Sequence, residues 1–533
     1  MDDASISRKY RERLLSDPDR PGYHFCIPDG CGVPGDPNGA FYADGRYHLM
    51  YLYRNTAANA FHWGHISSAD LLHWIHHPDA LTGLDGDEGC FSGGAFVDDD
   101  GTAYLSFWQF PSRDRTCPGG LALASSRPPY DVWERMESLA VASDPDVWGC
   151  ATAETEDGPD HRGCADPSNI WKAGGKYYMQ AGNLCVLNAY GRASADSPYA
   201  GDWVTLYRSD DLKSWTYAGR FYSNPRSDPS WPDSGEDCMC PAFCPLPGAR
   251  DDAGFTDKWI EIFIAHNRGA QYYVGDYRPE EEKFFPEVHG RFSWRDSAVF
   301  APETLIDGEN RLIVWYWLAS NFNMALEKYG WSGMYTFPRQ LWWEDGRLHM
   351  APVRELDRLE TDEKTVPAGK LDGAAAIEAG DGRSFRVKAK IDMRGAKRFG
   401  LRVRIDPKTG ECSEIMLDAE RGVLEVRGAV SREAAERIDL LYSQKGLPHL
   451  QTAVRDGYMK EEAPLVPGKT EGIYELDVFA DQSILEVYVN GTQAVGRETY
   501  PTDPAAATGI EMFSDGAQIL SMKTFVMMRI NPY

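Results

Sequence analysis

The feature that most constrains the fold is a seven-residue pattern, S-x-D-L-x-x-W, that occurs twice in this chain of 533 residues. The first copy spans residues 68–74 and the second spans residues 209–215. They start 209 − 68 = 141 residues apart, which is two units of about 70 residues if one unit lies between them. Repetition at this period is typical of β-propeller blades, because each blade is a small sheet that cannot bury both of its faces alone.

Short strand-like runs surround both copies and continue to residue 355, with almost no long helical periodicity. Aspartate–glycine turns such as Asp44-Gly45 and Asp100-Gly101 precede several of these runs, which is a hairpin signal. Examples of such runs are residues 46–53, 102–107, 176–180 and 311–317. We therefore predict an all-β protein in which residues 21–355 form a five-bladed β-propeller.

The two ends of the chain are predicted to lie outside the propeller. Residues 1–20 are charged and amphipathic and predict a helical N-terminal arm. Residues 356–384 are first charged and then rich in glycine and alanine, which indicates a domain junction. From residue 385 onwards apolar and polar residues alternate, as in strands with one buried face. Several such strands joined by turns predict a β-sandwich over residues 385–533.

The net charge of −26 argues against nucleic-acid and membrane partners, because such a surface repels phosphate backbones and anionic lipids. The sequence has no apolar core of a signal peptide and no run of about 18 apolar residues. Its 11 cysteines, an odd number spread along the chain, are typical of reduced thiols in an intracellular protein. We therefore expect a cytoplasmic protein, and the sequence leaves room for a homo-oligomer.

Three acidic sites stand out because each interrupts a stretch that otherwise has the pattern of strands and turns. They are Gly35-Asp36-Pro37-Asn38-Gly39, Ala165-Asp166-Pro167 and Gly235-Glu236-Asp237-Cys238. The innermost strands of a propeller bring residues of separate blades together near its axis, so these carboxyl groups can meet. Retaining cleavage of a glycosidic bond needs a carboxylate nucleophile and a carboxylic acid of raised pKa, about 5 to 5.5 Å apart. An isolated Asp-Pro pair is usually a turn, so this prediction depends on the whole set.

Further segments strengthen this interpretation. In chain order, residues 35–39, 61–74, 89–95, 165–167, 301–305, 337–341 and 483–491 read GDPNG, FHWGHISSADLLHW, GCFSGGA, ADP, APETL, FPRQL and SILEVYVNG. With these segments the chain resembles glycoside hydrolase family 32, the invertase, inulinase and levanase family, over nearly its whole length. The first segment resembles that family's nucleophile motif, and the third resembles the block whose Phe and Ser line the fructose pocket.

The resemblance implies a role for each acidic site. Asp36 would be the nucleophile, Glu236 the general acid and base, and Asp166 the stabiliser of the transition state through fructose hydroxyls. The residues implied to shape the fructose pocket are Asn38, Trp63, Phe91 and Ser92. The reaction would pass through a fructosyl-enzyme ester and would need no metal or other cofactor.

Two departures from the family pattern bear on this site. Ala165 replaces the arginine of the family's Arg-Asp-Pro motif, which removes a forked hydrogen-bond donor. The usual Glu-Cys-Pro order appears as Glu236-Asp-Cys-Met-Cys-Pro241, so a strict register would put Met239 at the acid position. Because methionine cannot donate a proton, we expect a shifted register with Glu236 as the acid, or Asp237 in its place.

The leading hypothesis is a hydrolase of β-fructofuranosyl linkages in sucrose, fructo-oligosaccharides, inulin or levan. A fructosyltransferase would use the same carboxyl groups and differ only in what intercepts the ester. An inverting arabinan or xylan hydrolase with five blades would place its carboxyl groups more than about 6.5 Å apart. A non-catalytic fructan-binding protein would account for the altered acid motif and the missing arginine.

Overall fold

The computed structural model describes residues 9, 12, 16–28, 35–83, 88–224, 228–294, 298–318, 331, 333–430 and 458–530. The chain divides into two compact units. The larger unit comprises residues 27–292 and 299–349, and the smaller comprises residues 1–26, 293–298 and 350–533.

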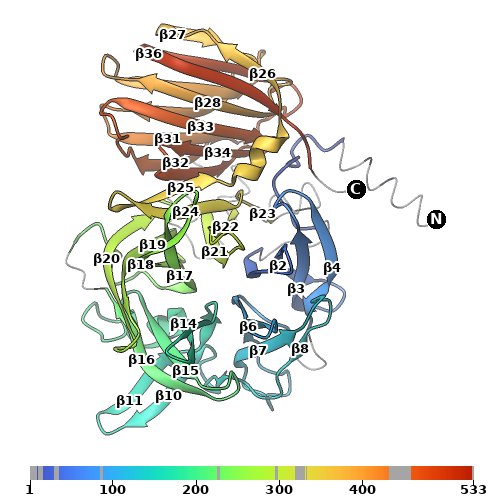
Figure 1. The fold of residues 1–533 in the computed structure, drawn as a ribbon, viewed down its shortest axis with the longest axis vertical. Coiled ribbons are helices and arrows are strands. Elements are labelled where there is room, and N and C mark those ends of the chain that lie inside the picture. The colour runs from blue at the N-terminus through green and yellow to red at the C-terminus, as the bar shows by residue number, and fades with distance from the viewer. Residues whose placement is uncertain are drawn as a thin grey trace. The chain divides into compact units, whose positions relative to one another are not determined.

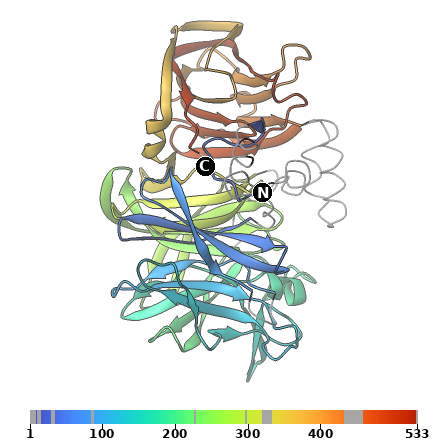
Figure 2. The same cartoon turned by 90° about the vertical axis from the view of Figure 1, so that its right-hand side faces the viewer.

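In its described part, the larger unit contains five antiparallel sheets of four or five strands, which form a ring in Figure 1. This confirms the predicted five-bladed propeller, and Figure 2 shows the strong twist of the blue strands of blade 1. Blade 1 consists of β1 (Pro37–Ala43), β2 (Arg46–Asn55), β3 (Ala60–Ser68) and β4 (Trp74–Leu81). Blade 2 consists of β5 (Ala95–Val97), β6 (Ala103–Gln109), β7 (Gly120–Ser126), β8 (Glu134–Arg135) and β9 (Val141–Ala142).

The remaining three blades follow the same order along the chain. Blade 3 consists of β12 (Ala165–Pro167), β13 (Trp171–Ala173), β14 (Lys176–Gly182), β15 (Trp203–Ser209) and β16 (Trp215–Ser223). Blade 4 consists of β17 (Met239–Ala249), β18 (Asp252–Ala265), β19 (Gly269–Arg278) and β20 (Lys283–Arg291). Blade 5 consists of β21 (Val299–Ile306), β22 (Leu312–Leu318), β23 (Met334–Tyr335), β24 (Arg339–Glu344) and β25 (Arg347–Pro352).

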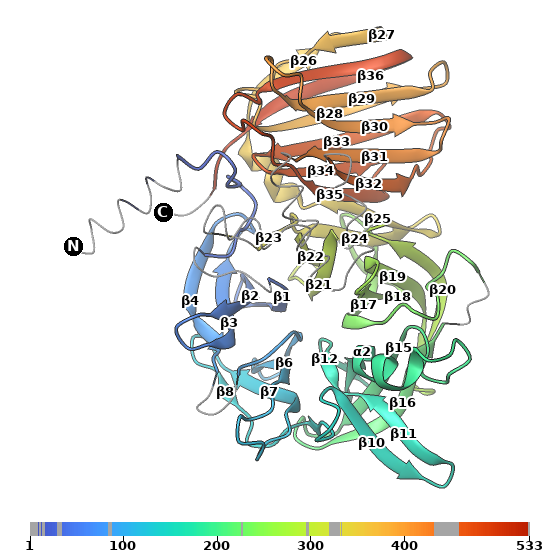
Figure 3. The same cartoon turned by 180° about the vertical axis from the view of Figure 1, so that it is seen from behind.

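Two short additions interrupt the regular blades. A separate hairpin of β10 (Cys150–Thr155) and β11 (Gly158–Gly163) precedes blade 3 and projects from the ring in Figures 1 and 3. Within blade 3, helical turns α2 (Leu184–Val186) and η1 (Leu187–Gly191) connect β14 to β15.

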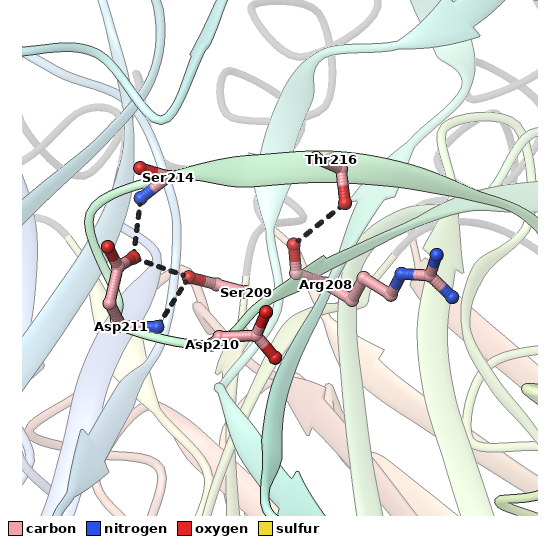
Figure 4. A pocket seen from close by; sticks show the side chains of 6 residues that line it. All are labelled: Arg208, Ser209, Asp210, Asp211, Ser214 and Thr216. Atoms are coloured by element: carbon pink, nitrogen blue, oxygen red, sulfur yellow. Dashed lines mark hydrogen bonds between the residues drawn. The ribbon is translucent and has the colours of Figure 1, made fainter.

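The repeated seven-residue pattern forms the same turn in blades 1 and 3, between the last two strands of each. The carboxylate of Asp211 accepts hydrogen bonds from the backbone N–H groups of Lys213 and Ser214, at 2.9 and 2.8 Å. Asp70 accepts the two corresponding bonds in blade 1, at 3.1 and 2.9 Å. The aspartate of the pattern therefore has a structural role in both copies. Figure 4 shows a small pocket at the blade 3 turn, lined by Arg208, Ser209, Asp210, Asp211, Ser214 and Thr216.

The smaller unit is built mainly of long antiparallel strands, as the alternating pattern predicted. The predicted apolar faces lie in β28 (Ser384–Asp392), β33 (Ile473–Asp481) and β34 (Ile484–Val489), and their apolar side chains are buried in the core. The other strands are β29 (Arg398–Ile405), β30 (Ser413–Asp418), β31 (Val423–Ala429), β32 (Tyr458–Pro464), β35 (Gln493–Glu498) and β36 (Gly509–Met527).

The segment that the sequence analysis interpreted as a junction is not a linker in the structure. A 3-10 helix, η2 (Arg354–Leu359), leads into β26 (Glu360–Val366) and β27 (Gly369–Ala376), and both strands pair with β36. Most side chains of these two strands are exposed or half-buried. Strands with so little buried surface have no apolar alternation, so the sequence pattern could not reveal them.

The start of the chain belongs to the smaller unit rather than to the propeller. Asp481 accepts hydrogen bonds from the backbone N–H groups of Gly22, Tyr23 and His24, at 2.7, 2.8 and 2.9 Å. The predicted boundary at residue 21 therefore differs from the division seen in the structure, which falls after residue 26. The predicted helical arm over residues 1–20 lies largely outside the described residues. No helix among the described residues is long and apolar enough to cross a membrane.

Candidate active site

Three propeller blades begin with the same bend in their innermost strand. In each, a residue directly before a proline has a positive φ: 39° for Asp166, 47° for Cys240 and 34° for Ala301. The pairing register is also shifted at each of these points. Such bulges re-aim side chains and are strained for non-glycine residues, which is why they occur at functional sites. The labels of these strands, β12, β17 and β21, lie with β1 around the middle of the ring in Figure 3.

Asp36 lies directly before β1, and its side chain is held from blade 2. The hydroxyl of Ser92 donates a hydrogen bond to Oδ2 of Asp36. Burial raises the pKa of Asp36 to about 6, although the bond from Ser92 and the charge of His266 both act to lower it. A carboxyl group in this state is ionised above about pH 6 and is poorly solvated, which favours a nucleophile.

Asp166 lies in the same electrostatic environment as Asp36. Burial and the charge of Asp36 raise the pKa of Asp166 to about 7. The thiol of Cys240 donates to Oδ2 of Asp166 at 3.4 Å, which connects the inner strands of blades 3 and 4. The charge of Asp36 therefore acts on Asp166, and the two buried carboxyl groups share one electrostatic environment.

The four predicted pocket residues occupy different depths. Asn38 is buried and bonds through Nδ2 to the backbone oxygen of Asp36 at 3.0 Å, while its Oδ1 accepts from Gly93 N–H at 3.1 Å. Trp63 is fully buried, and its indole donates to the backbone oxygen of Phe91 at 3.2 Å. Asn38 and Trp63 therefore hold the backbone around Asp36 and Phe91 through hydrogen bonds. The ring of Phe91 is half-buried and accessible to a ligand.

Phe91 belongs to a group of stacked aromatic rings beside Ser92. The ring of Phe91 lies 4.7 Å from Phe110 and 6.0 Å from Trp148, and Trp148 stacks on Trp108 at 4.0 Å. Phe91, Phe110 and Trp148 are all half-buried. Flat, partly exposed rings of this kind can cover the apolar faces of sugar rings.

Glu236 is placed differently from the two aspartates. Its carboxylate accepts two hydrogen bonds from the guanidinium of Arg291, both at 3.0 Å, and a third from Gln271 at 3.1 Å. The Glu236 side chain is 3% exposed and that of Arg291 is 14% exposed. Both carboxyl oxygens of Glu236 are therefore engaged by Arg291, and the side chain is almost completely buried. Its predicted role as the acid stays a prediction.

This ion pair predicts a large effect on stability. We expect Glu236→Gln to lower the free energy of unfolding by about 3 kcal/mol, because it leaves the buried charge of Arg291 uncompensated. Urea unfolding of the two proteins would measure the difference. Glu282→Gln is the matched control, since Glu282 pairs with the more exposed Arg208 at 2.8 Å, and its loss should cost less than about 1 kcal/mol. Equal effects of the two changes would contradict this interpretation.

Asp237, the alternative acid, pairs with a histidine that the sequence analysis did not identify. Its Oδ1 accepts from the backbone N–H of His266 at 3.0 Å, and its Oδ2 accepts from Nδ1 of the His266 ring at 2.8 Å. The carboxylate is 1% exposed, whereas the histidine side chain is 43% exposed. Burial lowers the pKa of His266, but the charges of Asp237, Asp166 and Asp36 outweigh it, so the pKa is raised overall.

The bends before proline could have revealed more of this site from the sequence. Asp166-Pro167 and Cys240-Pro241 have the same backbone bend, so Cys240 is the blade 4 counterpart of Asp166. Met239 is then the counterpart of Ala165, and Glu236 lies three residues further back. His266 carries no such signal, because it lies in the connection between β18 and β19.

Three cysteines lie close together in the sequence next to Glu236 and Asp237. Cys238, Cys240 and Cys244 are buried free thiols. Within the described ranges of the chain, no three His, Cys, Asp or Glu side chains are arranged to hold a metal ion.

The chain matches models of a known protein family and is similar in sequence to known proteins. Residues 30–352 match the model of the glycosyl hydrolases family 32 N-terminal domain, and residues 355–528 match the model of the glycosyl hydrolases family 32 C terminal. The chain is 28% identical over 447 residues to sucrose-6-phosphate hydrolase of Zymomonas mobilis, covering 79% of this chain and 81% of that protein. It is 26% identical over 550 residues to levanase of Bacillus subtilis, covering 96% of this chain and 70% of that protein.

Solved structures support the same fold. Fructan 1-exohydrolase IIa from Cichorium intybus superimposes with a TM-score of 0.74 at 20% identity, covering 96% of this chain and 98% of that chain. Exo-inulinase from Aspergillus awamori superimposes with a TM-score of 0.72 at 18% identity, covering 97% of this chain and 99% of that chain.

Proposed function

We propose that this chain, which belongs to glycosyl hydrolases family 32 and is a hydrolase of the β-fructofuranosidase type, cleaves terminal β-fructofuranosyl linkages with retention. The observation that carries this proposal is that two buried carboxyl groups from different blades, Asp36 bonded by Ser92 and Asp166 bonded by Cys240, share one electrostatic environment. The proposed substrates are sucrose, fructo-oligosaccharides, inulin or levan. The levanase of Bacillus subtilis is named for one of these substrates, whereas the sucrose-6-phosphate hydrolase of Zymomonas mobilis is named for a phosphorylated sucrose.

In the proposed reaction, Asp36 attacks the anomeric carbon of fructose as the bond to the leaving oxygen breaks. The product is a fructosyl ester on Asp36 and an alcohol, and water then hydrolyses the ester to release fructose. Asp166 accepts hydrogen bonds from fructose hydroxyls, which strengthen as positive charge develops on the sugar. The half-buried rings of Phe91, Phe110 and Trp148 support binding of the sugar next to the fructose.

Product analysis tests this proposal. The purified protein is incubated separately with sucrose, inulin and levan, and the released sugars are identified by chromatography. We expect free fructose from at least one of the three, and none from an Asp36→Asn variant. Fructose absent from all three incubations would contradict the proposal. Longer saccharides in place of fructose at high sucrose concentration would assign the chain to fructosyl transfer instead.

The hydrogen bond from Ser92 predicts a shift in the pH profile. Because this bond lowers the pKa of Asp36, Ser92→Ala should raise that pKa further above its ordinary range. Ionised Asp36 is required for attack, so kcat/KM falls as the pH drops through about 6, and in the variant it should fall at a higher pH. Rates measured between pH 4 and pH 9 would locate this limb. Ser214→Ala, at an exposed turn position, should leave the limb unmoved, and an unmoved limb in Ser92→Ala would refute the assignment.

A further inference from the structure

The proposed reaction needs a proton for the leaving oxygen, and the residue at the expected position cannot supply one. The bend at Cys240 makes Met239 the counterpart of Ala165 in blade 3, and neither side chain has an acidic proton. Both carboxyl oxygens of Glu236 are bonded by Arg291, one also by Gln271, and the side chain is only 3% exposed, so it is not open to a leaving oxygen. A proton donor must therefore be sought among the other groups that share the charge environment of Asp36.

His266 shares that environment. Its charge acts on both Asp36 and Asp166 and lowers the pKa of each, so the imidazole lies within the field of the two carboxyl groups. The ring also packs edge-on against Phe300 of β21, with 5.6 Å between ring centroids. At 43% exposure the side chain is accessible to a ligand. The negative charges of Asp36, Asp166 and Asp237 act on its ring.

Asp237 gives this histidine a fixed orientation and charge. The aspartate is almost completely buried and bonds both to the backbone N–H of His266 and to Nδ1 of its ring. A carboxylate at Nδ1 fixes the ring orientation and stabilises the imidazolium, as in other histidines that carry protons in catalysis. The surrounding negative charges act in the same direction and raise the pKa of His266.

We propose that His266, oriented by Asp237, protonates the leaving oxygen in this reaction, in place of a carboxylic acid. This inference rests on the proposed function. As Asp36 forms the ester with the anomeric carbon, the proton of the imidazolium passes to the leaving oxygen, which departs as an alcohol. The neutral imidazole then takes a proton from the water that attacks the ester. Fructose is released, and the imidazolium and the Asp36 carboxylate are restored. His266 is the catalytic acid and base in this scheme, and Asp237 is a positioning residue.

A pair of substrates separates proton donation from every other role of His266. Sucrose needs protonation of its leaving oxygen, whereas β-D-fructofuranosyl fluoride releases fluoride without a proton. We expect His266→Asn to reduce sucrose turnover by about 10²- to 10⁴-fold. Fluoride release, measured with azide present to intercept the ester, should stay within about tenfold of wild type, with fructosyl azide as the product. Asp237→Asn should show the same selective loss to a smaller extent.

The control is His73→Gln, which should leave both rates unchanged. His73 is also paired through Nδ1 with an aspartate, Asp70 at 3.0 Å, but it is 64% exposed and lies on a blade 1 turn.

Each outcome decides between the possibilities. Full sucrose turnover in His266→Asn, or equal loss of both substrates, would overturn the role of His266. A selective loss of sucrose in Glu236→Gln, with His266→Asn unaffected, would assign the acid to Glu236 and also overturn it. If the wild-type protein cleaves neither substrate, the proposed function itself fails. That result is distinct from failure of the histidine assignment.

Discussion

Asp36→Asn is expected to reduce sucrose turnover by more than about 10⁴-fold, which exceeds the usual contribution of a single acid or base. The amide is isosteric but cannot form the fructosyl ester, so the covalent route is lost entirely. The Ser92 hydroxyl can still donate to the side-chain oxygen of the amide, so the site should keep its geometry. Initial rates of fructose release from sucrose measure the effect, and the melting temperature confirms that the variant is folded.

The matched control for this prediction is Asp79→Asn in the same blade. The carboxylate of Asp79 accepts hydrogen bonds from Tyr53 and His62 and takes no part in the proposed chemistry. Turnover in Asp79→Asn should therefore be close to that of wild type. Turnover in Asp36→Asn within about tenfold of wild type would rule out Asp36 as the nucleophile.

Asp166→Asn is expected to change activity and stability in opposite directions. Turnover should fall by about 10²- to 10³-fold, because an amide stabilises the developing positive charge less well than a carboxylate. Stability should rise at pH 8, where wild type must keep a buried Asp166 ionised. The folded-state pKa of about 7 lies above the unfolded value, so this penalty is absent below about pH 4 and complete above about pH 7. It amounts to roughly 4 kcal/mol, the free energy of raising the pKa of Asp166 from its ordinary value to about 7.

Unfolding at pH 4 and pH 8, together with sucrose assays, measures both effects. Asp202→Asn is the comparison, since burial also raises the pKa of Asp202 to about 6 while its side chain bonds to Tyr273 and Asn224 outside the site. That variant should keep its turnover. A stability gain for Asp166→Asn that does not depend on pH, or normal turnover, would contradict the account.

The sequence predicted most of the fold because turns and apolar alternation are local signals. The repeated turn at Asp70 and Asp211 indicated the blades, and the alternation from residue 385 indicated the sandwich. Strands β26 and β27 were interpreted as a junction because their largely exposed side chains leave no alternating pattern. The attachment of residues 22–24 to Asp481 depends on a contact between positions more than 450 residues apart. No local pattern encodes such a contact.

The candidate site was predicted in part for the same reason. Asp36 and Asp166 stand in short motifs before proline, and the structure brings them into one charge environment. The register around Glu236 could not be decided from the sequence, because it depends on the backbone bend at Cys240. His266 lies in a connection between two strands, and its importance becomes visible only through its bond to Asp237.

The central claim is that Asp36 and Asp166, delivered by different blades, act on one fructose unit through a covalent ester on Asp36. The most direct test is the anomeric configuration of the product when the enzyme cleaves sucrose in the presence of methanol, determined by NMR. Methyl fructoside formed by transfer does not change its anomeric form afterwards, so the product records the stereochemistry of the reaction. We expect methyl β-D-fructofuranoside, the result of two inversions at the anomeric carbon. The α-anomer would show a single displacement and would contradict the account.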